Sequence, residues 1–146
     1  MTSHCPVIAL SSRLSASGRR FILQELSKAG HPDIEPCHGD VFVVLFENDN
    51  IGLTELARLS SRSKSTISVM VRRLTTLGYL EKEDDQTDTR AVRIRLSEKG
   101  QKLRPVFEKI SKNMQKILSK GFSNSDLENF EQLLSRALKN FDASLQ

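Results

Sequence analysis

The chain has 146 residues, of which 38% are hydrophobic and 27% are charged, and its formal net charge is +4. This length and composition suit a soluble globular protein with one hydrophobic core. The longest apolar run, residues 41–46, is too short to span a membrane, the first residues lack a secretory signal, and the two cysteines make no disulfide framework. We therefore expect a cytoplasmic protein and exclude a membrane protein, a secreted disulfide scaffold and a large multidomain enzyme.

Positive charge is concentrated in the middle of the chain. Residues 51–104 hold 12 Lys and Arg against 7 Asp and Glu, whereas the two ends together are nearly neutral. A basic centre predicts an anionic partner, nucleic acid first. A solvated basic surface without a partner would give the same pattern.

The N-terminal third predicts two helices. Apolar residues recur at mostly helical spacing over residues 6–29, and the segment 30–33 ends that helix. A second helix is expected from Pro36 to Glu47, although the run 41–46 also fits a short buried strand. The polar residues 48–50 indicate a loop.

The middle third predicts two further helices and a hairpin. Thr54 is expected to cap a short helix over 55–59, which the polar turn 60–63 interrupts. Residues 64–77 carry apolar side chains every three or four positions, and Gly78 stands where a C-terminal cap belongs. The period then changes to two in residues 90–96, which predicts a half-exposed strand paired with 79–83.

Two helices are expected to close the chain. Ser97 caps the first, whose apolar stripe runs over residues 103–117 with a kink at Pro105, and Gly121 ends it. Ser123 and Asp126 then give a capping-box-like start to a helix over 124–143.

Helix, polar turn, helix and two-stranded hairpin is the order of a winged helix-turn-helix. We therefore predict a mainly α fold with a small β-hairpin wing (α+β), built as one domain over residues 1–146. Residues 36–97 form the winged helix-turn-helix lobe for DNA, and residues 6–35 and 98–146 form a helical dimerisation region. The outer helices carry more apolar stripe than a monomer of this size needs, which favours a homodimer.

The helix over 64–77 is the candidate for the DNA major groove, because its exposed face carries short polar groups and cations. Arg72 and Lys64 can reach guanine edges or phosphates, and Val69 can meet a thymine methyl. Arg73 lies near the boundary between the apolar and the exposed face of this helix. A structural ion pair therefore explains it as well as a DNA contact does. The candidate DNA-binding residues of this helix are Lys64, Ser65, Thr66, Ser68, Val69, Arg72 and Arg73. An ordinary amphipathic helix is the alternative, and the hairpin that follows favours DNA.

The hairpin supplies a second candidate contact. Arg90 follows its expected tip, where a long cation can enter a minor groove. Asp88 would be repelled by phosphate, so we assign it to orienting an arginine. For Arg90 the alternative is a solvent-exposed strand cation.

Several short motifs lie in this region: Leu56–Ala57, Leu74-x-x-x-Gly78-Tyr79-Leu80, Asp88-x-Arg90 and Leu96–Ser97–Glu98–Lys99–Gly100. On these residues the segment 53–103 resembles the MarR family of bacterial transcriptional regulators, and the last motif is similar to the family's LTxKG signature. The resemblance implies a homodimer whose terminal helices intertwine while two winged lobes straddle a pseudo-palindromic operator. It also implies that residues 64–77 are the recognition helix and that Arg90 is the wing arginine.

The turn 60–63 departs from the family pattern. It lacks the usual glycine, and Arg62 stands at a normally buried position, so its side chain must point outward or the turn must differ locally. Thr87 stands where many members have a second wing arginine or another polar residue.

The resemblance also implies a small lipophilic or aromatic effector, because many members are released from DNA by such ligands. Phe21, Phe42 and Phe107 are candidates to line its site, although each fits better as a core residue.

Cys37 is a redox candidate, because a thiol beside His38 in the first turn of a helix can have a lowered pKa. A buried, inert cysteine is the alternative, and the single tyrosine, Tyr79, is expected in the wing. His31, Cys37 and His38 are close in sequence, but no paired histidines follow on the later helix, so no metal site and no cofactor are predicted. No catalytic motif is present, and no enzyme is predicted.

The sequence thus predicts a sequence-specific regulator of transcription that binds double-stranded DNA as a homodimer, acts as a repressor and is released by a small ligand. Two alternatives stay open. One is a helical dimer that no longer binds DNA and contacts protein instead. The other is a thiol-based redox regulator that uses Cys37.

Overall fold

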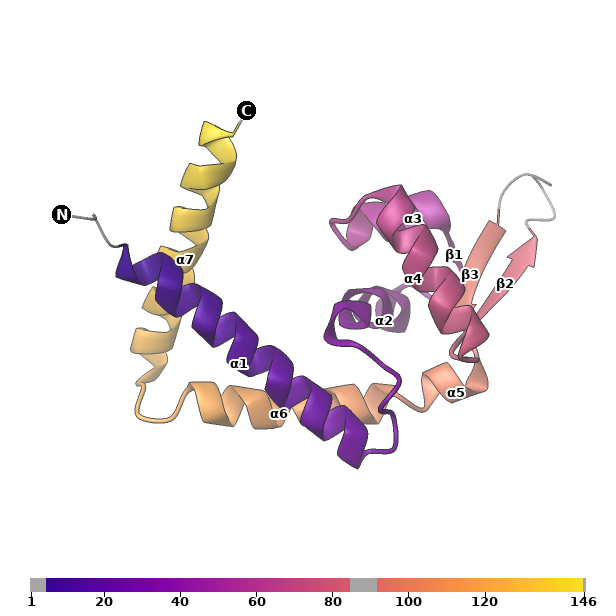
Figure 1. Cartoon of the computed structure of the whole chain (residues 1–146), viewed down its shortest axis with the longest axis horizontal. Coiled ribbons are helices and arrows are strands. Elements are labelled where there is room, and N and C mark those ends of the chain that lie inside the picture. Colours follow the sequence, from indigo (N-terminus) through magenta and orange to yellow (C-terminus); the bar gives the residue numbers. More distant parts are fainter. Residues whose placement is uncertain (1–4, 85–91, 146) are drawn as a thin grey trace. The chain divides into compact units, whose positions relative to one another are not determined.

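The structure is a computed structural model that describes residues 5–84 and 92–145. The chain divides into two compact units, Met1–Ile110 and Ser111–Gln146, and each is described by itself. Figure 1 shows the helices and the three-stranded sheet in chain order. The predicted mainly α fold with a small β wing is confirmed.

The first unit begins with the long helix α1, Pro6–Lys28. Pro6 occupies the first turn, where its missing N–H costs no hydrogen bond. After the helix, Gly30 adopts a φ of +88°, and the N–H of His31 donates to the carbonyl of Leu26 at 2.8 Å. Leu26 is the buried residue of α1. The large apolar residues of this helix that are exposed are Val7, Ile8, Leu10, Leu14 and Leu23.

A 3-10 helix, η1 (Pro36–His38), leads into α2 (Gly39–Glu47). The buried residues of α2 are Val41, Phe42 and Leu45, which share one face of a helix. A strand would bury alternate residues, yet Val43 is 54% exposed. The strand alternative for residues 41–46 is therefore wrong.

The helix-turn-helix consists of α3 (Leu53–Leu59) and α4 (Lys64–Thr76). Gly52 is the N-cap residue of α3, so the expectation that Thr54 caps this helix is wrong, and the helix begins earlier. Ser63 caps α4, because its Oγ accepts the N–H of Thr66 at 3.2 Å. Gly78 adopts a φ of +83° directly after the helix, at the expected cap.

The wing is formed by β2 (Leu80–Asp84) and β3 (Val92–Leu96), which pair antiparallel. Ile94 and Leu96 are buried, as the period of two predicts. A short strand, β1 (Ile51–Gly52), pairs with the other edge of β3 and gives the order β1-β3-β2. The sequence did not reveal β1, because two residues carry no periodicity.

The single helix predicted directly after the sheet is two helices in the structure. Ser97 Oγ accepts the N–H of Gly100 and caps α5 (Glu98–Gln101), and α6 (Arg104–Leu118) begins after a break. Pro105 sits at the start of α6, where a proline is tolerated, so it opens a new helix instead of kinking a continuous one. Gly100 lies so close to the carbonyl of Tyr79 that any β-carbon there would clash.

The second unit holds the end of α6 and the helix α7 (Asn124–Ser144). Ser123 and Asp126 exchange hydrogen bonds of 3.0 and 2.9 Å, so the predicted capping box is confirmed. None of the described side chains of α7 is buried in the single chain.

The core of the first unit gathers apolar side chains from α2, α3, α4 and the sheet. At its centre, the ring of Phe42 lies 5.9 Å from that of Tyr79 and 5.3 Å from that of Phe107. Among the helices that the structure describes, none has the length and apolar character needed to cross a bilayer.

Candidate nucleic-acid interface

Helix α4 presents a polar and basic face opposite its buried side. Ile67, Val71 and Leu74 face the core and Met70 packs against it, whereas the exposed positions lie on the opposite side. Val69 is 64% exposed in the middle of that face, and Ser68 is half-buried beside it. The exposed candidates are Lys64, Ser65, Thr66, Val69, Arg72 and Arg73, so six of the seven predicted residues are exposed.

Hydroxyl groups organise the first turn of α4. Ser63 Oγ lies 2.8 Å from Thr66 Oγ1 and 3.1 Å from Ser65 Oγ, and it also accepts the backbone N–H of Thr66. These bonds fix the start of the helix and hold Ser65 and Thr66 in one orientation. Short side chains at this end let another molecule approach the backbone closely.

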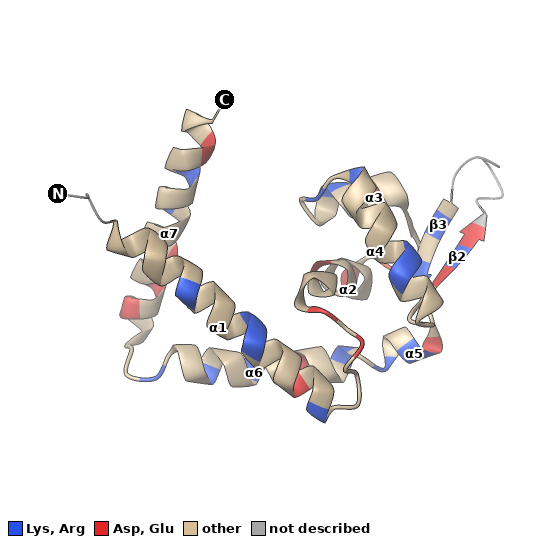
Figure 2. Cartoon of the chain, in the orientation of Figure 1, with Lys and Arg blue, Asp and Glu red and all other residues tan. Residues whose placement is uncertain are grey.

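The cations of the helix-turn-helix fall into two groups. Arg58 pairs with Glu55 on α3, and Arg62 pairs with Asp40 of α2. Lys64 and Arg72 of α4 form no ion pair with any carboxylate in the described ranges. Figure 2 shows Lys and Arg on α4 and at the turn before it. Lys64 and Arg72 are therefore available to an anionic partner.

Arg73 has a different neighbourhood. Burial lowers the pKa of His38 below its ordinary value, an effect that Glu35 opposes and the charge of Arg73 assists. The positive charge of Arg73 therefore favours the neutral form of His38, in the 3-10 helix η1 that precedes α2. The sequence left Arg73 between DNA contact and structural ion pair, and within the described residues it makes no ion pair.

The structure shows how the turn between α3 and α4 accommodates its departures from the family pattern. Ser61 has a φ of +52°, a conformation that favours glycine and strains other residues. Arg62 is exposed and donates from Nε and Nη2 to Asp40 Oδ2 at 3.1 and 2.7 Å. Of the two alternatives that the sequence left open, an outward-pointing Arg62 is confirmed.

Ion pairs join the two strands of the wing. Arg95 on β3 contacts Glu81 at 2.8 Å and Glu83 at 2.7 Å, so one guanidinium joins both strands of the hairpin. Arg93 donates to the side chain and the carbonyl of Asn50 beside β1. Asp88 and Arg90, with Thr87, lie outside the described residues, so their predicted roles stay predictions.

Cys37 does not have the environment of a reactive thiol. Burial is the largest effect that raises its pKa, and the carboxylate of Glu35 raises it further. Cys37 Sγ lies 3.6 Å from Glu35 Oε2 as a hydrogen-bond donor. The proposed lowering of its pKa by a helix N-terminus is therefore wrong, because desolvation and a nearby carboxylate outweigh it in this three-residue helix.

The possible metal ligands that lie together in the structure differ from His31, Cys37 and His38, which are close in sequence. Donor atoms of Glu35, Cys37 and His38 lie within 4.8 Å of one another, whereas His31 lies elsewhere. The N–H of Glu35 donates to His38 Nδ1 at 3.1 Å, and the thiol of Cys37 donates to the Glu35 carboxylate. These local hydrogen bonds account for the short distances.

Tyr79 lies in the core before the wing, not in the wing. Its hydroxyl donates to Asp33 Oδ1 at 3.0 Å and lies 2.9 Å from His31 Nδ1. Lys99 Nζ stands 4.1 Å from the centre of its ring. This network could not be predicted from the sequence, because His31 and Tyr79 are 48 positions apart along the chain.

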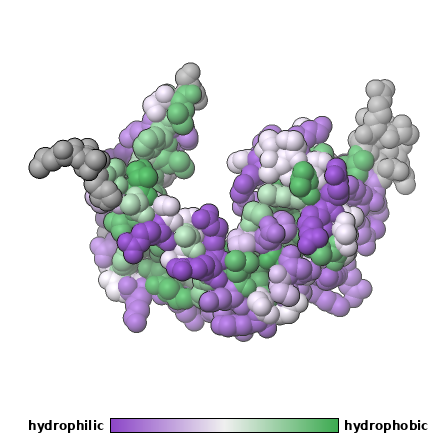
Figure 3. All heavy atoms as spheres, in the orientation of Figure 1, coloured by the Kyte–Doolittle hydropathy of each residue, from purple (hydrophilic) through white to green (hydrophobic). Residues whose placement is uncertain are grey.

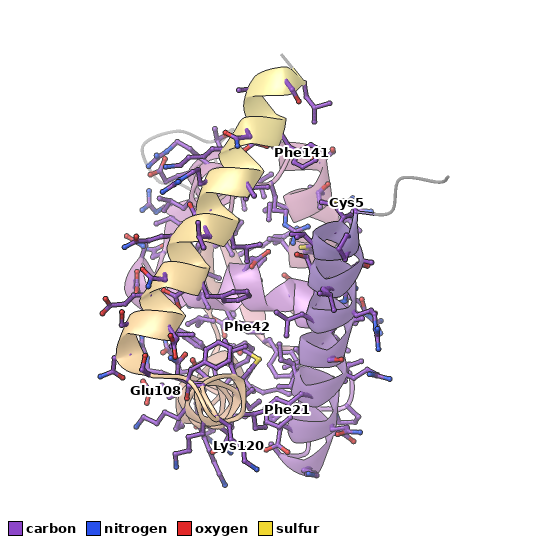
Figure 4. All side chains as sticks on the ribbon, turned by 90° about the vertical axis from the view of Figure 1, so that its left-hand side faces the viewer. Cys5, Phe21, Phe42, Glu108, Lys120 and Phe141 are labelled. Atoms are coloured by element: carbon purple, nitrogen blue, oxygen red, sulfur yellow. The ribbon has the colours of Figure 1, made fainter. Side chains whose placement is uncertain are left out.

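The three phenylalanines considered for an effector site belong to the core. Phe42 is fully buried, and Phe21 and Phe107 pack against the same cluster. Figure 4 labels Phe21 on α1 and Phe42 on α2. Their interpretation as core residues is supported, and the effector stays a prediction.

Comparisons with known proteins agree with this geometry. A family model described as a winged helix DNA-binding domain matches residues 44–100. The exopolysaccharide II synthesis transcriptional activator ExpG of Rhizobium meliloti is 31% identical over 84% of this chain. The chain spans 63% of the length of that relative.

Solved structures share the fold over most of the chain. A MarR transcriptional regulator from Methanosarcina mazei is 25% identical, with a TM-score of 0.74, and 93% of this chain and 96% of that one are covered. A mutant MarR from E. coli complexed with operator DNA has a TM-score of 0.79 at 21% identity, covering 91% and 94%. With the motifs of residues 53–103, these similarities show a winged helix fold that resembles that of the MarR family of transcriptional regulators.

Proposed function

We propose that the protein binds a pseudo-palindromic operator in double-stranded DNA as a homodimer and represses transcription there. The observation that carries this proposal is the outer face of α4. It combines two cations without an ion pair in the described part of the chain, Lys64 and Arg72, with Val69 exposed between them. Such a face suits the major groove, where arginine and lysine read guanine and an apolar group meets the thymine methyl.

In this mechanism α4 is the recognition helix and the wing contacts the neighbouring minor groove. Arg90 would enter that groove, with Asp88 orienting an arginine. Two such lobes related by a two-fold axis would read half-sites about 10 base pairs apart.

Exposed apolar surface supports the homodimer. Along α7 the large exposed side chains are Phe130, Leu133, Leu134, Leu138 and Phe141. Figure 3 shows hydrophobic residues on the visible surface of α7, and Figure 4 labels Phe141 on this helix. A second copy of the chain would remove these side chains from water, which is the main driving force for obligate association.

Repression follows where the operator overlaps a promoter, because a bound dimer excludes the polymerase. The relative from Rhizobium meliloti is named an activator, so the direction of regulation needs a direct test. A reporter driven by the operator, with and without the protein, gives it: lower expression with the protein supports repression, and higher expression contradicts it. We place this activity in the cytoplasm, with release by a small lipophilic or aromatic ligand.

The first experiment is selection of bound sequences from random duplexes at two salt concentrations. An inverted repeat with half-sites one turn apart, bound more weakly as salt rises, is the expected result. Lys64→Gln with Arg72→Gln should abolish enrichment, whereas Lys109→Gln with Lys116→Gln on α6 removes the same charge elsewhere and should preserve it. Enrichment of no sequence by the native protein, after ligand extraction, would contradict the proposal and favour a protein-binding dimer.

A further inference from the structure

The ion pair between Arg62 and Asp40 joins the turn before the recognition helix to the first turn of α2. Two nitrogens of the Arg62 guanidinium, Nε and Nη2, donate to the same carboxylate oxygen, Asp40 Oδ2, at 3.1 and 2.7 Å. Arg62 is two positions before Lys64, the first residue of α4.

This pair is exposed, so it can exchange partners at little cost. The side chains of Arg62 and Asp40 are 41% and 47% exposed. Exposed ion pairs contribute little to stability, because both charges interact well with water. The planar guanidinium suits a phosphate oxygen as well as a carboxylate oxygen.

In the proposed complex the Arg62–Asp40 ion pair lies near the phosphates of the DNA backbone. When the first turn of α4 lies in the major groove, the chain that enters this helix passes the phosphates bordering the groove. A free arginine there would be attracted to phosphate, whereas the carboxylate of Asp40 would be repelled by it.

We propose that Arg62 is a phosphate-binding residue and that the carboxylate of Asp40 competes with the DNA for it. DNA binding transfers Arg62 from Asp40 to a backbone phosphate. Asp40 therefore weakens binding to every sequence alike, and this sets the affinity without changing the operator that is read. This inference rests on the proposed function.

The test is a double-mutant cycle with Asp40→Asn, Arg62→Gln and the combined variant, measured on the selected operator at several salt concentrations. Asp40→Asn should tighten binding about three- to tenfold at low salt, because Arg62 no longer has to leave a carboxylate to reach the phosphate. The salt dependence should change little, because Arg62 contacts one phosphate per protomer in both proteins. Arg62→Gln should weaken binding to operator and to unrelated DNA by similar factors. In the combined variant the gain from Asp40→Asn should be lost.

Glu47→Gln is the matched control, because Glu47 lies on the same helix and has no ion pair within the described residues. If Glu47→Gln raises the DNA affinity as much as Asp40→Asn does, the gain is a general charge effect and the inference is overturned. The same holds if Asp40→Asn raises the affinity equally in the Arg62→Gln background. Unchanged or weaker binding by Asp40→Asn, with an unaltered unfolding temperature, overturns it as well. If the native protein binds no operator, the proposed function fails, and the inference falls with it.

Discussion

Tyr79 connects the loop after α1 to the winged helix core through one hydroxyl group. Its proton is donated to Asp33, so the His31 nitrogen that faces the same oxygen must act as the donor. The single tyrosine of the chain thus holds a polar chain of three side chains, and Lys99 covers its ring. Removing the hydroxyl would leave Asp33 and His31 without this partner.

The first prediction concerns alkaline pH. Burial, aided by Asp33, raises the pKa of Tyr79 from 10.0 to about 12. Because the folded state raises this pKa, the stabilisation is complete below about pH 10 and is lost as the pH rises through about 12. Tyr79→Phe should lower the free energy of unfolding by about 1–2 kcal/mol near neutral pH and remove this part of the alkaline decline.

The chain has no tryptophan and one tyrosine, so tyrosinate absorbance reports on Tyr79 directly. Titration of the folded protein should give a midpoint near 12, and urea-unfolded protein one near 10.0. Equal midpoints in the two states would contradict the account.

The second prediction concerns the two thiols. The raised pKa of Cys37 leaves less thiolate near neutral pH, whereas Cys5 is exposed. Iodoacetamide should therefore alkylate Cys5 faster than Cys37, as mass spectrometry of peptides would show. Mild peroxide should leave DNA binding by the native protein and by Cys37→Ser equal, and a response that Cys37→Ser abolishes would restore the redox alternative.

At the scale of elements, the turn between α3 and α4 carries local strain. Ser61 adopts a φ of +52°, where a β-carbon costs about 1–2 kcal/mol. Ser61→Gly relieves that cost and is expected to raise the free energy of unfolding by about 0.5–1 kcal/mol, after the larger chain entropy of glycine is subtracted. Ser111→Gly, in the regular helix α6, should lower it by several tenths of a kcal/mol, and chemical denaturation compares the two.

The sequence predicted those elements whose cause is local. Helix α4 is specified by apolar spacing, by Ser63 at its cap and by Gly78 after its end, so its bounds were nearly right. The strand β1 was missed because only its pairing with β3 makes it a strand. The partner of Arg62 was missed for the same reason, since Asp40 lies 22 positions away and only the packing of α2 against α4 brings it near.

The wing gives the next prediction. At its base, Arg95 forms ion pairs with Glu81 and Glu83. Arg90→Ala should weaken operator binding by about 1–3 kcal/mol, because the proposed minor-groove contact would lose its cation. Lys102→Ala is the control for loss of one exposed charge and should have little effect in a gel-shift titration. Equal affinities of the native protein and Arg90→Ala would remove the wing from the mechanism.

For the whole molecule, α7 is a long helix without a buried side chain in the single chain. A helix of this kind gains most of its stability from tertiary packing of its apolar face, so it needs a partner surface. The proposed homodimer supplies one, and this makes stability depend on protein concentration.

Phe141→Glu tests this dependence. Phe141 is 54% exposed on the apolar face of α7, and a carboxylate buried there in a dimer would be strongly unfavourable. Sedimentation should show a dimer for the native protein and a monomer for Phe141→Glu. Gln132→Glu adds the same charge on the opposite, polar face of α7 and should stay dimeric.

The same pair of variants links the dimer to DNA recognition. A dimer engages two half-sites at once, so the second contact benefits from the high effective concentration created by the first. Phe141→Glu should therefore lose most of its affinity for the full inverted repeat while keeping the weak affinity of one lobe for a single half-site. Gln132→Glu should keep both affinities, and a Phe141→Glu protein that binds the full repeat as tightly as the native chain would show that reading the operator needs no dimer through α7.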